Sequence, residues 1–202
     1  MFGFFKNKKK ELAKQIYGIF KPRIHLAQTK GVWKNHLSFG DAFINDDYLL
    51  AFFNMYINTQ MKANGVEGIE QGKMAVSIYE LMDPTYKDFT KVQRLMDRYH
   101  LLSKEPNKVF TKGTNDAFMM YNVITDHRIT SEFKSNPIYK EAIKYFDSGQ
   151  ATKDHTFAMK TMPKDLYDAD FMSNVPASFL KGNRIFEQTF VKRLNTVFKV
   201  NY

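Results

Sequence analysis

One segment constrains the fold more than any other, because residues 41–62 are apolar around most of a helical circumference. Apolar side chains recur in it at spacings of three and four, which is typical of an α-helix. A helix that is apolar on nearly every side has to be surrounded by other helices. We therefore expect a central helix that starts with Asp41 as its N-cap and ends near Lys62, before the stop at residues 64–65.

Amphipathic segments with helical spacing lie on both sides of this one. Proline, glycine or a capping Asp or Asn separates them, and such residues are typical of helix ends. The other predicted helices are residues 8–20, 67–82, 84–104, 114–124, 137–148 and 177–198, with a weaker one near 153–160. Their connections are short, so the sequence predicts a mainly α fold, an irregular bundle of six to seven helices.

Residues 23–38 have no clear helical pattern. Ile24 and Leu26 alternate with polar neighbours, and residues 29–31 have the composition of a turn. A small β-hairpin near 23–38 and an irregular loop explain this stretch equally well. Pro22 is interpreted as the end of the preceding helix.

The chain shows no internal repeat and no low-complexity linker. We therefore expect a single helical domain, residues 37–202, preceded by an extended basic N-terminal arm or helix, residues 1–36. The absence of cysteine among the 202 residues excludes disulfides, thiolate metal sites and a cysteine nucleophile. The sequence has no signal-peptide pattern and no apolar run of the ~20 residues that a spanning helix needs, so we expect a cytoplasmic protein.

Positive charge is concentrated in two stretches of the sequence. Residues 1–36 contain nine Lys or Arg and one acid, a net charge of +8, and residues 177–202 have a net charge of +4. Residues 37–176 have a net charge of −3, which completes the total of +9. This asymmetry indicates contact with nucleic acid, a membrane surface or an acidic protein face. Lys outnumbers Arg by 24 to 6, which counts against base-specific recognition of DNA.

The string MFGFFKNKKK places three phenylalanines beside four lysines. Such a composition suits lipid headgroups, nucleic-acid phosphates and bases, or another protein subunit. As residues that dock an anionic partner or a protein we select the aromatic and basic side chains of the two charged stretches: Phe2, Phe4, Phe5, Lys6, Lys8, Lys9, Lys10, Lys14, Arg184, Lys192 and Arg193.

No catalytic, metal-ligand or nucleotide-binding motif stands out, so we expect no catalytic residue, no metal site and no cofactor. The histidines have none of the spacings of zinc sites; they are His25, His36, His100, His127 and His155. A cluster formed by Asp165, Asp168 and Asp170 lacks the glycine and the closing glutamate of a calcium loop.

Asp46 and Asp47 lie within the predicted central helix, and we expect both on its exposed edge. A carboxylate that proved to be buried there would need a partner. It would then be the best candidate for a functional carboxylate in this sequence.

Together these features predict a non-catalytic adaptor or assembly protein, a component of an oligomer or of a large particle such as a virion. Other protein subunits are the expected partners. The alternatives are an accessory nucleic-acid-binding protein, a peripheral membrane protein, and an enzyme with a dispersed site near His100, His127 or His155.

Overall fold

The computed structural model describes residues 2–31, 38–127, 129–161 and 175–200. In these ranges the chain is mainly helical and contains no strand, which confirms the predicted fold class. It forms more helices than the six to seven expected. The chain divides into two compact units, which are described separately: unit 1 is Met1–Thr114 with Arg193–Tyr202, and unit 2 is Asn115–Lys192.

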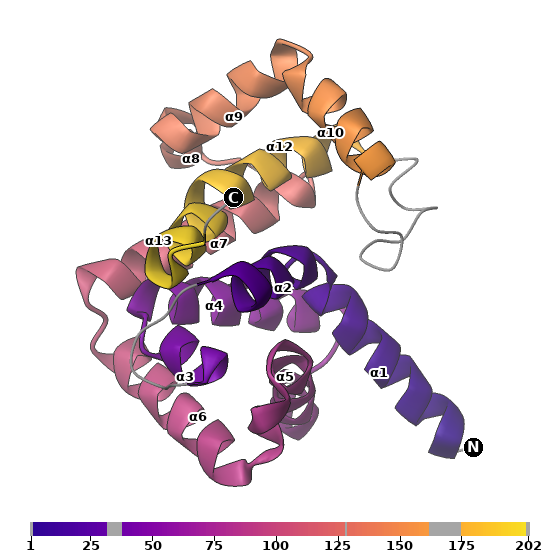
Figure 1. Cartoon of the computed structure of the whole chain (residues 1–202), viewed down its shortest axis with the longest axis vertical. Helices are drawn as coiled ribbons and strands as arrows, with labels where there is room; N and C mark the ends of the chain where they lie inside the picture. Colours follow the sequence, from indigo (N-terminus) through magenta and orange to yellow (C-terminus); the bar gives the residue numbers. More distant parts are fainter. Residues whose placement is uncertain (1, 32–37, 128, 162–174, 201–202) are drawn as a thin grey trace. The chain divides into compact units, whose positions relative to one another are not determined.

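Unit 1 contains most of the helices and is discontinuous in sequence (Figure 1). Its elements are α1 (Phe2–Gly18), α2 (Lys21–Lys30), α3 (Phe39–Ile44), α4 (Asp47–Ala63), α5 (Gly68–Met82), the 3-10 turn η1 (Pro84–Lys87), α6 (Phe89–Lys104), the start of α7 (Lys108–Ile124) and nearly all of α13 (Lys192–Phe198).

Helix α4 is the centre of unit 1, as its apolar circumference predicts. Seven of its side chains have no exposed surface: Leu49, Leu50, Ala51, Phe52, Phe53, Ile57 and Met61. The ring of Phe53 lies 4.7 Å from that of Phe20, between α1 and α2, and 5.2 Å from that of Tyr79 on α5. These edge-to-face ring contacts anchor the neighbouring helices to α4.

The predicted start of this helix at Asp41 is wrong, because the chain breaks at residues 45–46 into α3 and α4. Asp46 has an extended backbone, with φ −97° and ψ 109°, and its carboxylate accepts a hydrogen bond from the Leu49 N–H at 2.9 Å. An N-cap residue leaves the helical conformation in order to make this bond. The apolar pattern continues across the break and therefore does not reveal it.

Two further predicted boundaries are also wrong. Asp83 caps only η1, and α6 begins at Phe89 with Asp88 as its own N-cap. Helix α7 begins at Lys108, before the predicted start at Thr114. In both places a nearby Asp or Asn makes a cap that competes with the residue chosen from the sequence.

The predicted β-hairpin is not found, because residues 21–30 form α2. Pro22 lies in the first turn of this helix, where its fixed φ is favourable and its missing N–H costs nothing. Ile24 and Ala27 are buried three residues apart, which is a helical spacing. Residues 32–37 of the predicted hairpin lie outside the described residues. The N-terminal segment is also helical from Phe2, rather than extended.

Unit 2 contains the rest of α7, then α8 (Ser131–Ser135), α9 (Pro137–Asp147), α10 (Gln150–Thr161), α12 (Ala177–Phe186) and a π-helical turn, η3 (Glu187–Val191). Helix α9 begins as predicted, with Asn136 as its N-cap and Pro137 in its first turn. Gly182 of α12 lies directly against Ile124 of α7, so these two helices approach closely.

Gly113 marks a close approach of α7 to α4 within unit 1. A Cβ atom at this position would lie 2.6 Å from the backbone oxygen of Tyr48 and 3.1 Å from the Cβ atom of Ala51. We expect Gly113→Ala to lower the free energy of unfolding by ~1–3 kcal/mol, because the backbone of α4 cannot move aside without strain. Denaturant titration followed by circular dichroism measures this change.

Gly72 on α5 is the matched control, since a Cβ atom there would have no atom within 4 Å. Gly72→Ala is expected to raise the free energy of unfolding by up to ~1 kcal/mol through helix propensity alone. An equal stabilisation by both substitutions would contradict the close approach at Gly113.

Candidate functional site

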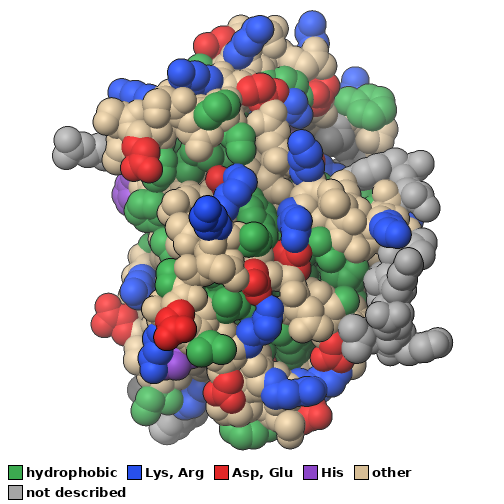
Figure 2. All heavy atoms as spheres, turned by 90° about the vertical axis from the view of Figure 1, so that its left-hand side faces the viewer, with side chains coloured by type: hydrophobic (Ala, Val, Ile, Leu, Met, Phe, Trp, Pro, Cys, Tyr) green, Lys and Arg blue, Asp and Glu red, His purple; other side chains and the backbone are tan. Residues whose placement is uncertain are grey.

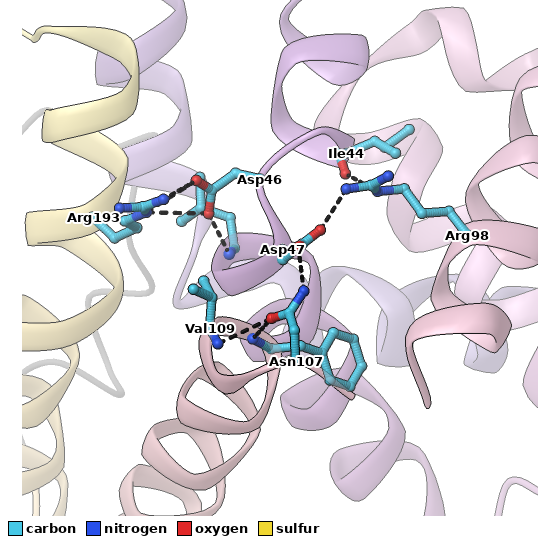
Figure 3. A network of polar contacts seen from close by, with 9 residues as sticks. Ile44, Asp46, Asp47, Arg98, Asn107, Val109 and Arg193 are labelled. Atoms are coloured by element: carbon cyan, nitrogen blue, oxygen red, sulfur yellow. Dashed lines mark hydrogen bonds and ion pairs between the residues drawn. The ribbon is translucent and has the colours of Figure 1, made fainter. Parts of the chain in front are cut away.

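A polar cluster surrounds the start of α4, and Asp46 is its most buried member (Figure 3). The residue is only 9% exposed, so its predicted place on an exposed edge is wrong. Arg193 Nε lies 3.2 Å from Oδ1 and 3.0 Å from Oδ2 of Asp46, and Nη2 lies 2.5 Å from Oδ2. The buried charge is therefore balanced by a guanidinium and by the N-terminus of α4. In turn, the hydrogen bonds to Asp46 raise the pKa of Arg193.

Asp47 points away from Asp46 and binds two other segments (Figure 3). Arg98 of α6 forms an ion pair with Asp47 and also donates through Nε to the Ile44 carbonyl oxygen at 3.0 Å. Asn107 donates to Asp47 Oδ2 at 2.7 Å, and its own side-chain oxygen accepts the backbone N–H of Val109 at 3.0 Å. Asp47 therefore connects the start of α4 to α6 and, through Asn107, to the start of α7, and Arg98 also binds the end of α3.

The arrangement of these groups decides which chemistry they support. The two carboxylates face different partners, so they cannot share a proton or clasp one cation between them. Elsewhere in the described ranges, no three His, Asp or Glu side chains lie together in a way that could hold a metal ion. The cluster is therefore best explained as an ion-pair network that joins α3, α4, α6, α7 and α13.

A second buried cluster lies where α3 meets the end of α5. The Asp83 carboxylate accepts the backbone N–H of Gly40 and that of Thr85, both at 2.9 Å. The neighbouring Tyr86 is 1% exposed, and its hydroxyl has no hydrogen-bond partner in the described part of the chain. Burial, together with the carboxylates of Asp41 and Asp83, raises the pKa of Tyr86 far above its ordinary value of 10. The hydroxyl therefore stays protonated at every physiological pH.

Unit 2 has a cluster of its own, which links α9, α10 and α12. Arg184 binds both carboxylate oxygens of Glu141, the closest at 2.7 Å, and its guanidinium lies 4.3 Å from the centre of the Tyr145 ring. The Tyr145 hydroxyl donates to Asp154. Burial first, and then this hydrogen bond, raises the pKa of Tyr145 to about 12.

The residues predicted to dock a partner differ in how exposed they are and in whether they pair within the chain. Four of the lysines are exposed on α1: Lys8, Lys9, Lys10 and Lys14. Lys9 pairs with Glu70 of α5 at 2.5 Å, and this pairing, with Lys73, lowers the pKa of Glu70. Lys14 pairs with Glu11 at 2.8 Å.

The two selected arginines are occupied within the chain, since Arg184 binds Glu141 and Arg193 binds Asp46. Lys192 is exposed. Four further positions belong to the backbone of α1, but their side chains lie outside the described residues: Phe2, Phe4, Phe5 and Lys6. His36 and the cluster of Asp165, Asp168 and Asp170 also fall outside the described ranges.

The sequence did not reveal which large apolar side chains remain exposed. Ile69, Phe89 and Leu101 in unit 1 are 80%, 77% and 63% exposed, and Phe157 in unit 2 is 68% exposed. The spacing of Phe89 assigns it to the buried face of a helix, but its position directly after the cap Asp88 places it at the start of α6. Figure 2 shows one face on which Lys and Arg side chains are interspersed with Asp and Glu, with hydrophobic side chains between them.

Comparison of the chain with protein-family models, curated proteins and solved structures finds no match. Among the described helices, none combines the length and the hydropathy needed to cross a bilayer.

The Asp46–Arg193 pair should be energetically coupled. We expect a double-mutant cycle of Asp46→Asn and Arg193→Gln to give a coupling of about 1–2 kcal/mol, because the carboxylate is buried although the guanidinium is partly exposed to solvent. The exposed pair of Glu11 and Lys14 is the control, for which the coupling should stay below ~0.5 kcal/mol. Equal couplings in chemical unfolding would show that burial adds nothing to the Asp46–Arg193 pair.

The sign of the change in the free energy of unfolding on removal of the Tyr86 hydroxyl tests whether this hydroxyl lacks a hydrogen bond. Tyr86→Phe removes a buried hydroxyl that no group in the described ranges satisfies, so the free energy of unfolding should stay the same or rise by up to ~1 kcal/mol. Tyr79 is the control, because its hydroxyl accepts a hydrogen bond from Asn54 at 2.6 Å. Tyr79→Phe should therefore destabilise by ~1 kcal/mol. A clear destabilisation by Tyr86→Phe would mean that its hydroxyl is satisfied in solution.

Proposed function

We propose that the protein is a non-catalytic helical adaptor or assembly protein that acts by docking other protein subunits. One contrast supports the proposal. The buried or half-buried Asp46, Asp47 and Arg98 satisfy one another or neighbouring helices, whereas large apolar side chains are left in contact with water. Charged groups used in this way position helices, and exposed large apolar groups are typical of protein–protein contacts.

Phe89 is the strongest single candidate for such a contact in unit 1. It is 77% exposed at the first residue of α6, whereas the next apolar residue of this helix, Val92, is buried. An exposed aromatic ring on a rigid helix is a frequent anchor at interfaces, because it buries a large area at a small cost in conformational entropy. The proposal includes a place in a cytoplasmic complex or in a large particle such as a virion.

Site-specific photo-cross-linking in cells tests this function. We expect a photoreactive amino acid at Phe89 to give a discrete cross-linked species, identified by mass spectrometry as a single protein subunit or a second copy of the chain. The same group at Lys87, an exposed residue of η1, should give little of this species. Phe89→Ser should weaken the association about tenfold or more and change the stability of the free chain by less than ~0.5 kcal/mol.

Two results together would refute the adaptor proposal. The first is the absence of any discrete species that depends on position 89. The second is a strictly monomeric protein in light scattering at every protein and salt concentration.

A further inference from the structure

Helix α5 turns one side toward the interior of unit 1 and leaves the other side open to water. Ile78 and Met82 are buried, whereas Ile69 is 80% exposed. Side chains that follow Ile69 at spacings of four, three and four residues share its side of the helix. This outer stripe of α5 consists of Ile69, Lys73, Val76 and Glu80, of which Lys73 is exposed and Val76 and Glu80 are half-buried.

The outer stripe carries two opposite charges, Lys73 and Glu80, seven residues apart. Seven residues fall within about 20° of two complete helical turns and span about 10 Å along the axis, so both charges lie on the same side of α5. The apolar Val76 lies between them, and the apolar Ile69 lies one turn before Lys73. A stripe with a cation near one end and an anion near the other complements itself when it is turned end to end.

Both charges are available to a partner. Lys73 pairs with Glu70 at 3.1 Å, but Glu70 also pairs with Lys9 at 2.5 Å and keeps that cation when Lys73 turns outward. The Lys73 side chain is 69% exposed. The Glu80 side chain forms no ion pair or hydrogen bond within the part of the chain that the structure describes. An unpaired carboxylate beside exposed apolar residues favours a contact that supplies a cation.

A second copy of α5 that runs antiparallel to the first supplies this cation. With a two-fold axis beside Val76, Lys73 faces Glu80 of the second copy, and Glu80 faces Lys73 of the second copy. Val76 contacts its own equivalent at the axis, and Ile69 lies near Pro84, an exposed residue just beyond the end of α5. A parallel pair would instead bring Lys73 beside Lys73 and Glu80 beside Glu80, so the charges select the antiparallel arrangement.

We propose that the outer stripe of α5 forms an antiparallel, two-fold contact with the outer stripe of a second copy of the chain. The charges argue for this partner, because a uniformly basic or acidic surface would leave either Lys73 or Glu80 facing a like charge. The inference rests on the proposed docking function, since it names one of the docked subunits and the surface that holds it. A contact between two single helices lies at the low end of interface sizes, so we expect a dissociation constant of about 1–100 µM.

Analytical ultracentrifugation of the full chain tests the dimer, which we expect to form and dissociate with protein concentration. Lys73→Glu and Glu80→Lys, each alone, should weaken association about tenfold or more, because like charges then face each other twice across the axis. An equimolar mixture of the two variants should associate as tightly as the unchanged chain, since the mixed dimer restores both pairs of opposite charges.

The matched controls for these variants are Lys87→Glu and Glu105→Lys, which make the same changes in charge at exposed positions outside α5. Each control should associate as the unchanged chain does. Circular dichroism and melting temperature should be the same in all variants, so that a loss of association reports on the contact and not on folding.

The position of the axis is tested by cross-linking. The chain contains no cysteine, so an introduced cysteine is unique. Val76→Cys should form an intermolecular disulfide under mild oxidation, because the two equivalent residues lie together at the axis. Leu101→Cys, at an exposed position of α6, should form little of this species.

Three results would overturn the α5 contact. The full chain stays monomeric at its highest soluble concentration, the mixture of the two charge variants fails to associate, or Leu101→Cys forms the disulfide as readily as Val76→Cys. Cross-linking from Phe89 to a different protein would still support the adaptor function in each of these cases. A dimer without any species that depends on Phe89 would instead support the α5 contact and remove the docking role of Phe89.

Discussion

A carboxylate removed from water has to find positive charge, and at Asp46 this requirement organises unit 1. Two sources of positive charge lie beside the Asp46 carboxylate. One is the N-terminus of α4, where the carboxylate accepts the Leu49 N–H, and the other is the guanidinium of Arg193. Asp47, one residue further along, faces Arg98 and Asn107. Because the cap of the central helix is also the partner of the C-terminal helix α13, helix initiation and tertiary packing depend on one side chain.

Much of the fold follows from patterns that are visible in the sequence. The all-round apolar character of residues 41–62 predicts a central helix, although not its start at Asp47, and the caps of α9 predict where α9 begins. Breaks between helices that depend on a single capping residue are harder to predict from the sequence. Asp46 interrupts a continuous apolar pattern, and only its long-range partner explains why an acid is tolerated there. Pro22 illustrates the same difficulty, since proline ends one helix and begins the next with equal ease, and only the burial of Ile24 decides between them.

The candidate sites were less predictable than the fold for a related reason. A count of basic residues treats all cations alike, but Arg184 and Arg193 are bound to carboxylates of the chain, whereas Lys10 is exposed on α1. Exposure of Phe89 likewise depends on where α6 begins, which is decided by the cap at Asp88. The surface that is available to partners thus depends on which charged and capping side chains are already bound within the chain. A count of residues does not contain that information.

The discontinuity of unit 1 has a consequence for the order of events during synthesis. Asp46 and Arg193 are 147 residues apart, and all of unit 2 lies between them in the chain. The ribosome therefore releases the central helix long before the residue that neutralises its cap, and unit 2 is fully emerged by then. Residues 115–192 can form their local contacts first, whereas unit 1 has to wait for α13 with an unpaired carboxylate at its centre. Helix α13, which is made after all of unit 2, thus completes the unit that was begun before it.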